Sequence, residues 1–134
     1  MRWSVAPSTE EAALLMEAGV IYRDSKRFQE ARDVFKGVRA LFPQSDLPEI
    51  ALGTVAFQEG DFEGAIKHYR RALEINPRSA HAHAHLGEVY LFKMDKDTAR
   101  QHVKKALELD PRGEAGKMAR ETGQLTDVVE FKTE

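Results

Sequence analysis

The sequence contains no cysteine, which excludes disulfide bonds and thiol chemistry. No stretch approaches the ~20 consecutive apolar residues of a membrane span, and residues 1–7 hold no apolar run of the kind found in signal peptides. The net charge is −2 with both signs interspersed, which disfavours nucleic-acid binding by bulk electrostatics. These absences predict a cytoplasmic protein with no membrane span and no nucleic-acid partner.

Catalytic motifs are absent as well. The sequence shows no nucleophile paired with a base, no glycine-rich phosphate loop and no carboxylate pair with an evident task. We therefore predict a protein that is not an enzyme and that needs no cofactor.

The sequence instead repeats itself with a period of 34 residues. Glycines, alanines and prolines recur at this interval: Gly19, Gly53 and Gly87; Ala31, Ala65 and Ala99; Pro43, Pro77 and Pro111. A glycine within a helix costs roughly 0.5–1 kcal/mol relative to alanine, so three at one register need a shared reason. Close approach of two helices supplies that reason, and the period predicts stacked helix hairpins.

Seven helices follow from this periodicity. Ser8 to Glu11 predicts a capping box, Asp46 to Glu49 resembles one, and each proline marks the end of a second helix. The expected helices span residues 8–24, 28–42, 47–59, 62–75, 80–93, 96–109 and 114–122.

The middle unit resembles a tetratricopeptide repeat. It carries the family's small and aromatic residues at the expected offsets: Leu52, Gly53, Ala65, Tyr69, Ala72 and Pro77. Comparable residues define units at 12–45, 46–79 and 80–113. The resemblance implies an all-α, right-handed solenoid of three repeats with a short capping helix at 114–122. The array is expected to be one domain, 8–122, between an N-terminal extension, 1–7, and a C-terminal tail, 123–134.

Members of this family generally bind peptides or partner helices on the concave side, which the first helix of each pair lines. The family's groove positions, transferred one by one, predict the partner-binding residues Met16, Val20, Arg23, Leu47, Ile50, Thr54, Phe57, His81, Ala84, Glu88, Leu91 and Phe92. The set is largely apolar, which favours an apolar peptide or an amphipathic helix as the partner. The alternative for any single member is that it belongs to the core.

One family function is disfavoured. Tetratricopeptide domains that hold a C-terminal carboxylate use Lys, Asn and Arg, but the matching residues here are Met16, Val20, Ala51, His81 and His85. The leading interpretation is an adaptor or scaffold that binds protein. A narrower alternative is a cytoplasmic chaperone similar to the small three-repeat chaperones of type III secretion.

Two further alternatives remain open. His81, His85 and Glu88 share a helix face and are a candidate zinc or nickel set, although we expect no bound metal. A self-assembling module is the other alternative, because the predicted last helix is short and contains Gly116. Incomplete covering of the last repeat predicts homo-oligomerisation or an obligate partner.

Overall fold

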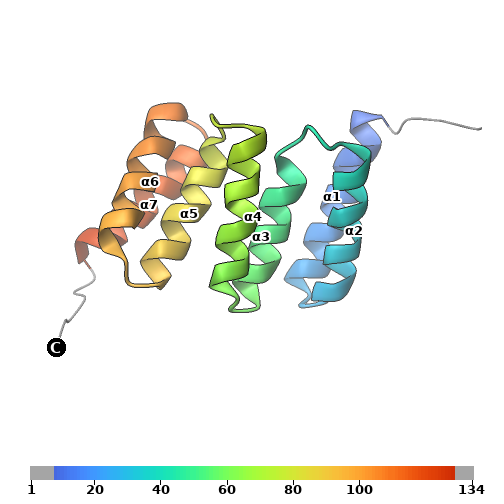
Figure 1. The fold of residues 1–134 in the computed structure, drawn as a ribbon, viewed down its shortest axis with the longest axis horizontal. Coiled ribbons are helices and arrows are strands. Elements are labelled where there is room, and N and C mark those ends of the chain that lie inside the picture. The colour runs from blue at the N-terminus through green and yellow to red at the C-terminus, as the bar shows by residue number, and fades with distance from the viewer. Residues whose placement is uncertain (1–7, 129–134) are drawn as a thin grey trace, which may run out of the picture.

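The computed structural model describes residues 8–128, and these form seven helices joined by short turns (Figure 1). The helices are α1 (Thr9–Asp24), α2 (Phe28–Leu41), α3 (Leu47–Gln58), α4 (Phe62–Ile75), α5 (Ala80–Phe92), α6 (Lys96–Leu109) and α7 (Glu114–Val128). They stand side by side as hairpins in chain order, with α1 and α2 at one end and α6 and α7 at the other (Figure 1). The expected all-α solenoid is confirmed.

The first six helices begin and end within one residue of their predicted bounds. The reason is local, because the caps are encoded in the sequence. Ser8 and Glu11 form the predicted capping box, and the side chains of Asp61 and Ser79 each accept a hydrogen bond from the backbone amide at the third position of the helix that follows.

Asp46 is an exception, and the expected second capping box is wrong. The Asp46 side chain makes no capping hydrogen bond. Glu49, the residue expected to complete the box, is buried and instead bonds Arg39 at 3.1 Å and His68 at 2.9 Å. The Glu49 carboxylate, which was expected to cap the start of α3, therefore joins α3 to its neighbours α2 and α4 instead.

The final helix is longer than predicted, which changes how the array ends. α7 continues to Val128 rather than stopping at residue 122, and it packs on both α5 and α6. Gly116, interpreted as weakening the helix, permits close packing, because a Cβ there would overlap the Asp110 carbonyl. Arg100 also pairs with Asp127 at 2.7 Å and fixes the end of α7 to α6. The expected incomplete covering of the last repeat is wrong.

The expected N-terminal extension, residues 1–7, and the last six residues of the expected tail, 129–134, lie outside the described residues. The first part of that tail is helical, since α7 contains it.

Two of the three repeated glycines lie where aromatic rings cross the first helices. A Cβ on Gly53 would overlap the ring of Tyr69, and one on Gly19 would overlap the ring of Phe35. Both rings are fully buried. The first two units are therefore each closed by a ring on the second helix that lies against bare backbone on the first, whereas in the third unit Val103 lies opposite Gly87.

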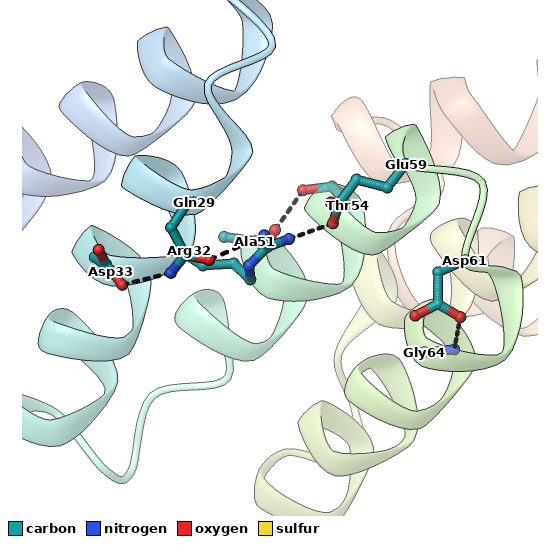
Figure 2. A network of polar contacts seen from close by, with 8 residues as sticks. All are labelled: Gln29, Arg32, Asp33, Ala51, Thr54, Glu59, Asp61 and Gly64. Atoms are coloured by element: carbon teal, nitrogen blue, oxygen red, sulfur yellow. Dashed lines mark hydrogen bonds and ion pairs between the residues drawn. The ribbon is translucent and has the colours of Figure 1, made fainter.

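Polar contacts at the surface join successive units. Figure 2 shows an ion pair between Arg32 on α2 and Glu59 at the end of α3, and it shows Asp61 capping the next helix at Gly64. A comparable pair joins Glu63 to Lys93, which links the second unit to the third. These ion pairs join the second helix of one unit to the end of the first helix of the next unit, and the first helices carry the candidate site.

Candidate functional site

A groove of about 580 Å³ lies between α1, α3 and the beginning of α5. Its walls come from the first helix of each unit, as expected for a concave face. The residues that line it are Ala13, Met16, Glu17, Val20, Arg23, Leu47, Ile50, Ala51, Thr54, His81 and His85.

Seven of the twelve predicted site residues line this groove. They are Met16, Val20, Arg23, Leu47, Ile50, Thr54 and His81. Their accessibility differs, because Leu47 is 53% exposed whereas Ile50 is only 7% exposed. Leu47 and the half-buried Met16 therefore offer accessible apolar area to a ligand, whereas Ile50 packs in the core behind the groove wall.

The other five predicted residues do not line the groove. Ala84 is fully buried among residues of α6 and α7, and Leu91 is 8% exposed in the central core. α7 accounts for Ala84, since Ala115 and Ala119 in its first turns pack on the side of α5 that would otherwise be open. The predicted cap helix, 114–122, already contains both residues, but the sequence did not show which side of α5 this helix would cover.

Phe57 and Phe92 belong to a cluster of three aromatic rings with Phe62. Ring centroids lie 5.1 Å apart for Phe57 and Phe92, and 5.5 Å apart for Phe57 and Phe62. The cluster joins α3, α4 and α5 near the ends of the first helices. Glu88, the fifth residue, is half-buried on α5, and burial raises the pKa of its carboxyl group.

Four groove residues were absent from the predicted binding set, namely Ala13 and three residues that share one repeat position. Glu17, Ala51 and His85 are spaced 34 residues apart, and all three line the groove. Ala51 was considered only as a carboxylate-clamp position, and His85 was considered as a clamp position and as a candidate metal ligand. The repeat period itself was the signal that could have added this position to the set.

A second, apolar pocket of about 330 Å³ adjoins the groove at the start of α1. It shares Ala13, Met16 and Leu47 with the groove and extends to Val38 and Phe42. The accessible apolar surface is therefore continuous from the groove to the crossing of α1 with α2 and α3.

The floor of the groove is polar. Arg23 donates a hydrogen bond from Nη1 to the Thr54 hydroxyl at 2.9 Å, and Thr54 in turn donates to the Ala51 carbonyl at 2.7 Å. The Arg23 guanidinium also pairs with Asp24 at 3.1 Å. The one cation in the floor is thus held by α3 and by its own helix.

His85 lies beside this cation and stacks on Tyr69, with ring centroids 5.2 Å apart. Burial, reinforced by the positive charge near His81 and Arg23, lowers the pKa of His85 to about 4. The imidazole is therefore neutral at pH 7. Within residues 8–128, neither His85 Nδ1 nor the Tyr69 hydroxyl has a hydrogen-bond partner.

This arrangement does not form a carboxylate clamp or a metal site. The clamp positions converge on the groove, but the two polar ones are histidines, and His85 is neutral. In the part of the chain described, no three His, Asp or Glu side chains are placed to hold a metal ion. His81, His85 and Glu88 therefore do not form the ligand set considered from the sequence.

None of the helices in residues 8–128 is long and apolar enough to span a membrane.

Comparisons with known proteins agree with this architecture. Family models described as TPR repeat or tetratricopeptide repeat match residues 12–45, 53–92 and 80–112. No curated protein sequence matches the chain.

Several solved structures share the fold. The type III secretion translocator chaperone SycD of Yersinia enterocolitica has a TM-score of 0.78 at 18% identity, covering 91% of this chain and 92% of SycD. PcrH in complex with the chaperone binding region of PopD gives 0.73 at 17% identity, covering 94% and 96%. The first TPR of Spaghetti (RPAP3), bound to the HSP90 peptide SRMEEVD, gives 0.70 at 19% identity, covering 92% and 99%. Likeness at these identities shows a common fold.

Proposed function

Because the chain belongs to the tetratricopeptide repeat family, we propose that it is a non-catalytic adaptor. It binds an apolar peptide or an amphipathic helix of a partner protein in the groove between α1, α3 and α5. The observation that carries the proposal is the accessible apolar wall formed by Met16, Val20 and Leu47 above a floor of fixed polar groups.

An amphipathic helix suits this groove for a physical reason. Its apolar stripe would cover the groove wall, with each large apolar side chain that becomes fully buried contributing about 1.5–3 kcal/mol. Its polar flank would face Glu17 and His81, the polar groove residues that are exposed. The adjoining pocket lined by Val38 and Phe42 offers one further apolar side chain a place to insert.

The fold alone does not select a partner, since the similar structures include both a type III chaperone and a domain that holds an HSP90 peptide. The chemistry of the groove favours an apolar segment of a partner protein over a peptide that is held by its C-terminal carboxylate. His85 is neutral, and Arg23 already donates to Thr54 and pairs with Asp24, so the floor offers a terminal carboxylate one partly engaged cation in place of the several Lys, Asn and Arg side chains of a clamp. A bound peptide should therefore keep its affinity when its C-terminal carboxylate is converted to an amide.

The test uses a peptide selected on the purified protein from a display library of random helical sequences and then labelled for fluorescence anisotropy. Met16→Gln and Leu47→Gln should each weaken binding about tenfold or more, because each removes apolar contact area. Leu41→Gln is the matched control, since Leu41 is 51% exposed, close to the 53% of Leu47, but lies outside both pockets. The groove would be contradicted as the binding site if Leu47→Gln and Leu41→Gln weakened peptide binding equally, or if neither variant weakened it.

A further inference from the structure

One side of α1 carries apolar side chains that no helix of residues 8–128 covers. Leu14 and Ile21 are 65% and 66% exposed, and they lie two turns apart with Ala18 between them. Within the described chain, α1 packs only on α2 and α3. We call Leu14, Ala18 and Ile21 the end face.

The repeat register identifies what kind of surface the end face is. Ala18 has Leu52 and Leu86 as its equivalents in the next two units, and these are 2% and 0% exposed. The equivalents of Ile21 in those units are valines with no exposure at all. In the second unit these side chains are buried because they pack on α2 of the unit before. The end face is therefore the surface with which a unit contacts the preceding unit, but the first unit has no preceding unit in the described chain. Its shape fits a helix of this repeat type.

The opposite end of the array is finished differently. α7 covers α5 and α6, and its exposed residues include the charged Lys117, Arg120 and Glu121. Stacking the end face of one copy on α7 of another would place apolar side chains against these charges. Pairing two end faces places apolar surface on apolar surface and closes the assembly at two copies.

The charges of α1 indicate the orientation of such a pair. Its first turn contains Glu10 and Glu11, and exposed Lys26 follows its last turn. Antiparallel packing lays the acidic end of one α1 over the basic end of the other, and it also aligns the two helix dipoles favourably. The small Ala18 at the middle allows close approach, with Leu14 of each copy opposite Ile21 of the other.

We propose that α1 binds α1 of a second copy of this chain about a two-fold axis that passes near Ala18. This contact is separate from the groove, because none of the three end-face residues lines the groove or the adjoining pocket. The dimer therefore presents two grooves.

A single engineered cysteine tests the geometry directly, since the chain contains no cysteine of its own. In a two-fold contact, a residue near the axis meets its own counterpart. Ala18→Cys should therefore form a disulfide-linked dimer in the full chain under mild oxidation, as seen on a non-reducing gel. Leu125→Cys is the matched control on the exposed surface of α7, where Leu125 is 50% exposed, and it should stay monomeric on the same gel.

Sedimentation velocity over the micromolar range tests the energetics. The unmodified chain should show a concentration-dependent monomer–dimer equilibrium. Ile21→Lys should raise the dimer dissociation constant about a hundredfold or more, because two isoleucines per dimer leave the contact. Circular dichroism should show unchanged helicity for this variant, since Ile21 is mostly exposed in the monomer.

Three outcomes would overturn the proposal. A chain that stays monomeric at every concentration leaves the end face to another occupant, such as the segment that contains Trp3. Oligomers larger than a dimer that are dispersed by Leu125→Lys show head-to-tail stacking on α7. A dimer that persists in Ile21→Lys places the contact elsewhere.

Discussion

Alanine substitution at three glycines separates helix propensity from helix packing within one protein. Gly37 lies on an exposed part of α2, and a Cβ there would meet nothing within 4 Å. A Cβ on Gly87 would lie 3.1 Å from Val103 Cγ2, and one on Gly53 would overlap the Tyr69 ring, with Cδ1 at 2.7 Å. The added methyl group therefore enters open space at Gly37, a tight contact at Gly87 and the volume of a buried ring at Gly53.

The magnitudes follow from two opposing effects. Alanine stabilises a helix by roughly 0.5–1 kcal/mol relative to glycine. Overpacking a filled core costs about 1–3 kcal/mol, and Tyr69 cannot move aside because its side chain is fully buried. We expect Gly37→Ala to gain up to about 1 kcal/mol, Gly87→Ala to change little, and Gly53→Ala to lose about 1–2 kcal/mol.

Thermal melting followed by far-ultraviolet circular dichroism measures the series. A change of 1 kcal/mol corresponds to about 3–5 °C for a domain of this size, so the three variants should separate clearly. The midpoints should fall in the order Gly37→Ala, Gly87→Ala, Gly53→Ala, from highest to lowest. Equal midpoints for Gly37→Ala and Gly53→Ala would refute the view that the Tyr69 ring requires bare backbone at this repeat position.

Three other changes have definite expected outcomes. The free energy of unfolding should fall as the pH drops from about 6.5 towards 4. Burial lowers the pKa of His102 to about 4, so in this range the unfolded chain binds a proton at His102 that the folded chain does not bind. The melting midpoint of His102→Gln should depend less steeply on pH across this range. Gly60→Ala should cost about 1–2 kcal/mol and lower the melting midpoint, because Gly60 has φ +82 in the turn after α3, and an unchanged midpoint would contradict this assignment. Phe57→Asp should lower the melting midpoint, because Phe57 is half-buried in the aromatic cluster and the change removes its apolar contacts with Phe62 and Phe92; an unchanged midpoint would return Phe57 to the accessible concave surface.

The sequence determined most of the fold because its determinants are local and repeated. The 34-residue spacing of Gly19, Gly53 and Gly87, together with caps such as Ser8 and Asp61, placed six helices to within one residue. The length of α7 was underestimated because Gly116 was treated as weakening the helix and the tail was expected to begin at Gly123. In the structure both glycines lie at close contacts, with the Asp110 carbonyl and with Val103, so tertiary packing outweighs their low helix propensity.

The candidate groove was predicted less completely, for a related reason. Register assigns a residue to a side of its helix, but it does not show what covers that side. Met16, Val20 and Leu47 remain accessible, whereas Ala84 occupies the position of Met16 in the third unit and is buried against the first turns of α7. The pairing of Arg23 with Thr54 joins residues 31 positions apart and has no signal in the spacing of either residue.

The central claim is that a partner peptide binds in the groove of α1, α3 and α5, and methyl NMR of the methionines tests it most directly. Met16 lines the groove, whereas Met94 is 58% exposed in the turn after α5 and lines neither pocket. During titration with the library-selected peptide, the Met16 methyl resonance should shift and saturate while the Met94 resonance stays in place. A saturating shift of Met94 with no change at Met16 would contradict the account.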